Sequence, residues 1–156
     1  MEFKELRKDE ISNVEKEFTK FWKKEDILKK SIDNRTDNFV FFDGPATANG
    51  MPGLHHMLAK FLKDAFCRYQ TMQGHRVVRR VGWDTHGLPV ELNVEKKLGF
   101  SGKKDIEKFG IKEFNQECRN IVWENEEAFC ELTERMGQFI DMENNYVTYN
   151  NDYIET

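Results

Sequence analysis

The chain has 156 residues, enough for one domain with a packed core, and 33% of them are charged and 38% hydrophobic. Its 13 Phe, 3 Trp and 4 Tyr argue against disorder. Its formal net charge of −4 gives no basic excess, so the composition does not indicate a free-standing nucleic-acid-binding protein. The three cysteines (Cys67, Cys118 and Cys130) lie far apart, and the chain has neither an apolar signal-peptide core nor a membrane-length apolar run, so we expect a cytoplasmic protein with no disulfide framework, no zinc site and no membrane contact.

The chain begins with a segment typical of a helical arm. Over residues 2–30, apolar side chains recur at helical spacing between Lys and Glu. Residues 31–38 are polar and predict a loop. The apolar run FVFF at 39–42 predicts a short strand, which Asp43-Gly44-Pro45 would end.

A turn-rich segment, ATANGMPG, follows and precedes a helix predicted over residues 55–72. The apolar stripe of this helix comprises Leu58, Leu62, Ala65, Phe66 and Tyr69. A second strand is predicted over 76–81 and a second loop over 82–89, where Pro89 is placed to begin a helix that reaches about residue 98.

The remaining chain reads as a connection at GFSGKKD and a helix over 111–136, and the tail is typical of a strand or an exit linker. The order of elements predicts an α/β fold with a parallel sheet. Two clear strands are few for such a sheet, so we expect strands from elsewhere to complete it. Residues 1–36 would form the arm and 37–156 the first half of a nucleotide-binding domain.

The first candidate site is the loop DGPATANGMPGLHH between the first strand and the next helix. Free N–H groups and the positive dipole end of a helix favour phosphate there, and Gly50 and Gly53 allow close backbone approach. His55 and His56 could donate hydrogen bonds to phosphoryl oxygens. The alternative is a tight loop that needs Gly, Pro and Asn only for its conformation. The sequence matches neither a P-loop nor GxGxxG.

The second candidate site is GWDTHGLPVE, after the second predicted strand. Asp84 would lie past a strand end beside Trp83 and His86, where a carboxylate can pair with a substrate ammonium group. The alternative is an Asp that caps the following helix. A catalytic metal site is disfavoured, because adjacent histidines at a helix start point in different directions.

These two segments resemble class I aminoacyl-tRNA synthetases. FFDGPATANGMPGLHHMLAKFLKD resembles their first signature, the HIGH region, and GWDTHGLPVELNVEKKLG resembles the downstream loop of isoleucyl-tRNA synthetases. The valine and leucine enzymes are similar but usually differ after GWD, so residues 85–89 favour isoleucine. The resemblance reaches the final NDYIET, which is similar to the lead-in to the inserted editing domain.

The resemblance implies a role for each matching residue. Pro45 would line the aliphatic pocket of the amino acid, and Asp84 would hold its α-ammonium group. Asn49, Gly50 and Gly53 would lie beside the nucleotide, whose phosphates His56 would meet. The signature falls on Gly53-Leu54-His55-His56, whereas the family more often has His at the first position and Gly at the third. His55 either substitutes for the displaced histidine or points away.

The resemblance also implies a Rossmann-like catalytic fold of which this chain is the first half. The intact enzyme would use isoleucine, ATP with Mg²⁺ and tRNA(Ile), forming an aminoacyl-adenylate before transfer. The second signature, KMSKS, does not occur here, so the carboxyl-terminal half would be a required partner and the chain alone would be inactive. The alternatives are a non-catalytic binding module derived from a synthetase, or part of a valine or leucine enzyme.

Overall fold

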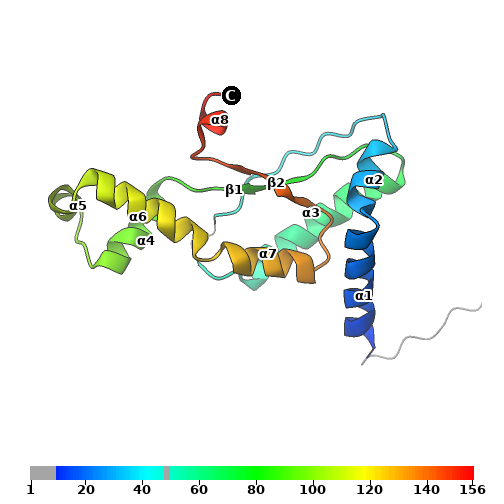
Figure 1. Ribbon diagram of the computed structural model, residues 1–156, viewed down its shortest axis with the longest axis horizontal. Coiled ribbons are helices and arrows are strands. Elements are labelled where there is room, and N and C mark those ends of the chain that lie inside the picture. The colour runs from blue at the N-terminus through cyan, green and yellow to red at the C-terminus, as the bar shows by residue number, and fades with distance from the viewer. Residues whose placement is uncertain (1–9, 48–49) are drawn as a thin grey trace, which may run out of the picture.

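The computed structural model of the chain describes residues 10–47 and 50–156. The described helices are α1 (Ile11–Lys24), α2 (Ile27–Asp33), α3 (Leu54–Met72), α4 (Leu88–Leu98), α5 (Lys103–Phe109), α6 (Ile111–Trp123), α7 (Glu126–Arg135) and α8 (Asn151–Ile154). The described strands are β1 (Arg80–Trp83) and β2 (Asp141–Val147). In Figure 1 the strands lie centrally, with α1 and α2 towards one end of the molecule and α4, α5 and α6 towards the other.

The two strands form a parallel sheet. Arg80 is paired with Asp141 and Trp83 with Val147, with an irregularity in register between Arg80 and Gly82. The parallel pairing confirms the predicted α/β class with a parallel sheet. It also confirms the strand alternative for the tail.

A third extended segment, residues 38–46, lies along the other edge of β1. Isolated parallel bridges join Asn38 to Arg76 and Ala46 to Trp83. Trp83 O accepts a hydrogen bond from Thr148 after β2, whereas Gly82 O accepts one from Ala46. Because successive carbonyls of a strand point to opposite sides, 38–46 and β2 must flank β1. The prediction of a regular strand at 39–42 is wrong in detail: this segment is extended and is bridged only at its ends.

The second predicted strand also begins later than expected. Residues 76–81 were predicted, whereas β1 covers Arg80–Trp83. Val77, Arg79 and Val81 are buried in alternation, as in a strand, but the regular ladder forms only where β2 lies alongside. Gly82 and Trp83 therefore belong to the strand, and the loop that follows begins at Asp84.

The amino-terminal arm is two helices where one was predicted, and residues 2–9 of that prediction lie outside the described part. Asp26 separates α1 from α2 and has a left-handed conformation, with φ of 49°. Asp tolerates this region better than most residues, so the chain can turn between the helices. Trp22 of α1 packs edge-on against Phe139, with ring centroids 5.8 Å apart, and this contact holds the arm against the segment before β2.

The carboxyl-terminal helical region is also more divided than predicted. The helix expected over 111–136 is interrupted at Glu124 and Asn125, which separate α6 from α7. The predicted connection GFSGKKD is wrong over its last three residues, which begin α5, and Gly102 and Gly110 bound this helix with φ of 116° and 111°. The periodic apolar pattern of the 111–136 region continues across Glu124 and Asn125, so periodicity alone did not reveal this break.

Helix α3 packs its polar face against the protein. Lys60, Asp64 and Thr71 are half-buried on the inward side, together with buried Cys67. The predicted apolar stripe faces outward, with Leu58 60% and Phe66 64% exposed. This arrangement is the reverse of that expected for a surface helix of a complete domain.

A buried arginine joins α3 to the sheet. Arg79 donates from Nη1 to Phe139 O at 2.9 Å and from Nη2 to Cys67 O at 3.1 Å. Asp64 Oδ1 lies 3.5 Å from Arg79 Nη1 and accepts the Phe139 N–H at 3.0 Å. Burial lowers the pKa of Arg79, and the nearby Cys67 and Asp64 partly offset this lowering. The pair fixes α3 at the amino end of the strands.

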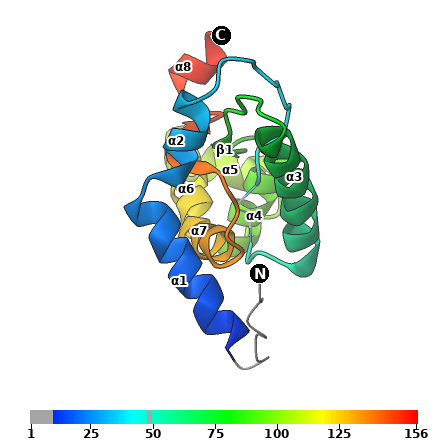
Figure 2. The same ribbon diagram turned by 90° about the vertical axis from the view of Figure 1, so that its right-hand side faces the viewer.

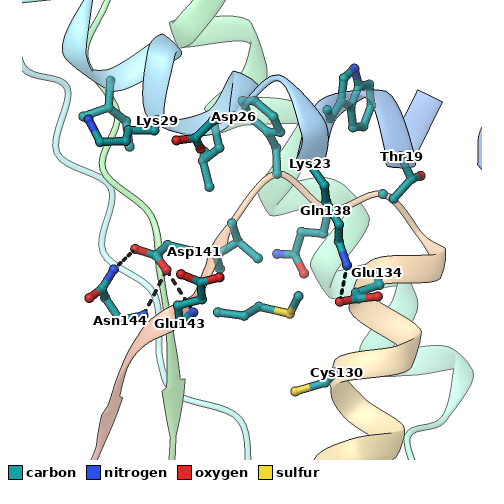
Figure 3. Close-up of a pocket in the computed structure, with 17 residues that line it drawn as sticks. Thr19, Lys23, Asp26, Lys29, Cys130, Glu134, Gln138, Asp141, Glu143 and Asn144 are labelled. Carbon is teal, nitrogen blue, oxygen red and sulfur yellow. Dashed lines mark hydrogen bonds and ion pairs between the residues drawn. The ribbon is translucent and has the colours of Figure 1, made fainter. Parts of the chain in front are cut away.

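A cleft of about 700 Å³ lies between the arm and the start of β2 (Figure 3). Asp141, at the first position of β2, lines it and accepts hydrogen bonds from the backbone N–H groups of Glu143 and Asn144. Burial would raise the pKa of Asp141, but these bonds and the Arg80 charge together lower it. The cleft is at the amino end of β2, whereas ligands of parallel sheets bind at carboxyl ends. No helix among residues 10–47 and 50–156 is long and apolar enough to cross a membrane.

Candidate functional site

The predicted site loops meet at the carboxyl end of β1. Asp84 follows β1 directly, and its N–H donates to Ala46 O at 2.8 Å. The Thr47 hydroxyl donates to Asp84 Oδ2 at 2.8 Å. Pro45 is therefore brought next to the Asp84 loop through its neighbour Ala46. One oxygen of the carboxylate is oriented by Thr47, and the group can present the other to a cation.

His56 occupies the first turn of α3 and caps the helix. The Gly53 N–H donates to His56 Nδ1 at 3.0 Å. Gly53 has no side chain to serve as an N-cap, so the imidazole supplies the acceptor that satisfies this terminal N–H. A backbone N–H can only donate, so Nδ1 is unprotonated and neutral His56 carries its proton on Nε2. Its Nε2–H is consequently a donor at the amino end of α3.

A buried phenylalanine connects His56 to β1. The Phe129 ring, which is 1% exposed, lies edge-on to His56 at 5.0 Å and edge-on to Trp83 at 6.1 Å. Trp83 immediately precedes Asp84, so the Phe129 side chain of α7 packs against both the start of α3 and the residue before the second loop. Figure 1 shows α3 and α7 on the same side of the strands. Burial, with the nearby charges of His55 and Lys60, lowers the pKa of His56.

The other residues of the first loop are less constrained. His55 is exposed, and its ring centroid lies 3.9 Å from that of His56. A Cβ on Gly53 would lie 3.0 Å from Cε1 of the exposed His55 side chain, which would have to shift slightly to admit a larger residue. Around Gly50, a Cβ would meet no described atom within 4 Å. Asn49, the remaining predicted nucleotide-loop residue, lies outside the described residues.

Three residues of this region were not predicted as site residues: Thr47, Phe129 and Thr148. Thr47 stands in the first candidate loop but was not named among its site residues, and Phe129 lies in the helix predicted over 111–136. Thr148 is 3% exposed, and its hydroxyl lies 2.7 Å from His86 Nδ1. These contacts join residues more than thirty positions apart, so local pattern could not reveal them.

No metal-binding group was found in the described part of the chain. Among residues 10–47 and 50–156 there is no cluster of three or more His, Cys, Asp or Glu side chains that could hold a metal ion. Burial raises the pKa of the thiols of Cys67, Cys118 and Cys130, which keeps them protonated at neutral pH.

The fold is similar to that of a solved synthetase structure. The crystal structure of the ternary complex of Agrobacterium radiobacter K84 agnB2 LeuRS with tRNA and LeuAMS matches 90% of this chain and 16% of that chain, with a TM-score of 0.62 and 17% identity. At this identity the likeness concerns the fold alone. It agrees with the Rossmann-like assignment and with the two-stranded parallel sheet of β1 and β2. Figure 2, viewed from the end that carries α1 and α2, shows α3 on the opposite side of the molecule from α1.

Sequence relatives are much closer. Isoleucine–tRNA ligase of Clostridium novyi (strain NT) is 47% identical over 146 residues, covering 92% of this chain and 14% of that protein. The Dehalococcoides mccartyi (strain CBDB1) enzyme is 50% identical over 145 residues, covering 92% and 14%. The Bacteroides fragilis (strain YCH46) enzyme is 48% identical, covering 99% and 14%. The chain thus spans only 14% of the length of these relatives.

The family model described as tRNA synthetases class I (I, L, M and V) matches residues 17–156. The match includes both site loops and every described element from the second half of α1 onward. The chain therefore belongs to the class I tRNA synthetases, an enzyme family, and the relatives compared here are isoleucine–tRNA ligases.

Proposed function

We propose that this chain is the amino-terminal part of an isoleucine–tRNA ligase, which activates isoleucine with ATP and transfers it to tRNA(Ile). The observation that carries the proposal is the Asp84 carboxylate, oriented by Thr47 at the carboxyl end of β1, where parallel sheets bind ligands. The 47% to 50% identity with isoleucine–tRNA ligases supports the choice of amino acid.

The amino acid would bind where the first two strand-end loops meet. In the proposal, Asp84 pairs with the α-ammonium group of isoleucine through its oxygen that Thr47 does not contact. Pro45 lies two residues before Thr47 and would line the pocket for the aliphatic side chain. Binding the ammonium group fixes the substrate carboxylate for attack on the α-phosphate, an effect of orientation.

ATP, entering with Mg²⁺ as the substrate complex, would bind along the first loop and the start of α3. Asn49, Gly50 and Gly53 would lie beside the nucleotide, and the amino end of α3 favours negative charge. The His56 Nε2–H would donate to a phosphate oxygen as charge develops. His55 is exposed beside it and would approach the same phosphates from a shifted position.

The rest of the enzyme would cover the outward face of α3 and the free edge of residues 38–46. This face exposes Leu58, Leu62 and Phe66 on α3, and Val40 and Phe42 on the edge segment. Burying it would complete the sheet and supply the second ATP-binding signature. Residues 1–36 would form an arm on the catalytic domain, which 37–156 begin, with an editing insertion after them. The same face would serve a non-catalytic module as a partner surface, and the following experiment separates the two.

The test is amino-acid-dependent exchange of pyrophosphate into ATP, measured with the full-length protein encoded by the reading frame that carries this chain. We expect isoleucine to drive exchange at a much lower concentration than valine. Because the two amino acids differ by one methylene, the ratio of their kcat/KM values should be limited to roughly 100-fold. Asp84→Asn should reduce kcat/KM for isoleucine about 100-fold, because a charge-assisted contact is lost. Exchange driven best by leucine or valine would assign another member of the family, and no exchange would favour the module.

A further inference from the structure

The Thr148 hydroxyl lies at the centre of a hydrogen-bond cluster after β2, in which Thr85 and Thr148 are buried and His86 is exposed. The Thr85 N–H donates to Thr148 Oγ1 at 3.0 Å, and Thr85 Oγ1 lies 3.1 Å from it. His86 Nδ1 lies 2.7 Å from the same oxygen. The Tyr149 N–H donates back to Thr85 Oγ1 at 3.1 Å. Thr85 and Thr148 are only 4% and 3% exposed, so water does not replace these partners.

The Thr148 hydroxyl can make all of these contacts at once, because a hydroxyl oxygen donates once and accepts twice. Thr148 Oγ1 accepts from the Thr85 N–H, and Thr85 Oγ1 accepts from the Tyr149 N–H. The Thr148 proton goes either to His86 Nδ1, with the Thr85 hydroxyl donating to Thr148, or to Thr85 Oγ1, with His86 Nδ1–H donating to Thr148. In both arrangements Thr148 Oγ1 joins Thr85 and His86.

The cluster holds the second loop from the side opposite Thr47. Thr47 and Ala46 fix Asp84 from the first loop, while Thr148 fixes the next two residues from the segment after β2. Asp84 therefore lies between two sets of contacts, one from the segment after residues 38–46 and one from the segment after β2. Losing the Thr148 hydroxyl removes the second set from the residues that follow Asp84.

We propose that Thr148 is a positioning residue for the amino-acid site, acting through the Asp84–Gly87 loop. This inference rests on the proposed function, because it assigns Thr148 to the pocket in which Asp84 binds the ammonium group. Thr148 itself contacts no substrate. Its effect is on how well Asp84 is placed, and it therefore concerns isoleucine binding more than ATP binding.

The experiment uses Thr148→Val in the full-length protein, with pyrophosphate exchange as the readout. Valine keeps the shape but removes the hydroxyl. We expect the KM for isoleucine to rise between about 10- and 100-fold, the scale of effect of a displaced binding group, while the KM for ATP stays unchanged. Thr148→Ser, which restores the oxygen, should return the KM for isoleucine to within about 2-fold of the original, since only a methyl group is lost.

Thr133→Val is the matched control. Thr133 is also 3% exposed, but its hydroxyl donates to Phe129 O within its own helix, α7, at 2.7 Å. The control should leave the KM for isoleucine unchanged even if it lowers thermal stability. The inference is overturned if Thr148→Val leaves the KM for isoleucine unchanged, raises both KM values equally, or is matched by Thr133→Val. An unmodified protein without isoleucine-dependent exchange would instead overturn the proposed function.

Discussion

The sheet beneath the site depends on close packing at single residues, and Gly82 in β1 is one residue where a larger side chain does not fit. A Cβ at this position would lie 2.1 Å from Tyr146 Cζ. The Tyr146 ring is held over the strand by stacking on Tyr153, with centroids 5.7 Å apart and an interplanar angle of 7°. Tyr146 belongs to β2, so the glycine permits the close approach of the two strands.

Gly82→Ala should therefore destabilise the chain by about 1–3 kcal/mol, the cost typical of overpacking a buried site. The measurement is thermal unfolding followed by circular dichroism. Gly44→Ala is the control, because a Cβ there meets no described atom within 4 Å and should cost far less. Equal losses at both positions would show that Tyr146 does not lie over Gly82 as described.

The candidate site could be predicted from sequence only where its residues belong to a recognisable loop. Asp84 and His56 belong to such motifs, and the structure has Asp84 directly after β1 and His56 in the first turn of α3. Thr148 stands in a tail whose weak alternation gave no indication of chemistry. Its partners His86 and Thr85 lie 62 and 63 residues away, and only the folded sheet brings them together.

At the scale of elements, the sequence predicted most helices and the existence of the strands but not their limits. Helix α3 differs from the prediction by one residue at its start, because a glycine-rich turn bounds it clearly. The arm and the 111–136 region were predicted as continuous because their apolar spacing continues through the breaks. Strand β1 depends on where β2 lies, and this information is not local.

The orientation of α3 depends on the pair of Arg79 and Asp64. Their side chains are 6% and 13% exposed, and Asp64 also pairs with Arg68 at 2.5 Å. Removing the Asp64 charge therefore leaves buried Arg79 with its hydrogen bonds to Phe139 O and Cys67 O but without that carboxylate. Asp64→Asn should destabilise the chain by about 3 kcal/mol. Asp33→Asn removes an exposed pair with Lys29 and should cause no measurable loss in the same thermal assay. A small effect of Asp64→Asn would indicate that the helix is held by its other contacts.

At α3, the polar face of the helix is turned into the molecule and the apolar face is exposed. The outward row comprises Leu54, Leu58, Phe61, Leu62, Phe66, Tyr69 and Met72, all more than half exposed. The predicted stripe of α3 was therefore a correct pattern whose partner does not lie in the described residues. Sequence periodicity shows that a helix has an apolar face, but not which part of a longer protein covers it.

This exposed face predicts that the chain alone self-associates. Contiguous apolar patches of this kind promote association, and the unpaired edge of 38–46 adds a site for strand pairing. Sedimentation velocity should show oligomers that grow with concentration. Phe66→Lys should shift the distribution towards monomer, while Lys20→Glu on exposed α1 should not. A monomer at all concentrations would show that the face needs no cover.

In the proposed function this chain binds the amino acid at a synthetase site that the rest of the enzyme completes. Isothermal titration calorimetry with a non-hydrolysable isoleucyl-adenylate analogue measures this dependence. The full-length protein should bind the analogue tightly, Asp84→Asn should bind it far more weakly, and the chain of residues 1–156 alone should show no measurable binding. Tight binding by the isolated chain, or undiminished binding by full-length Asp84→Asn, would contradict the account.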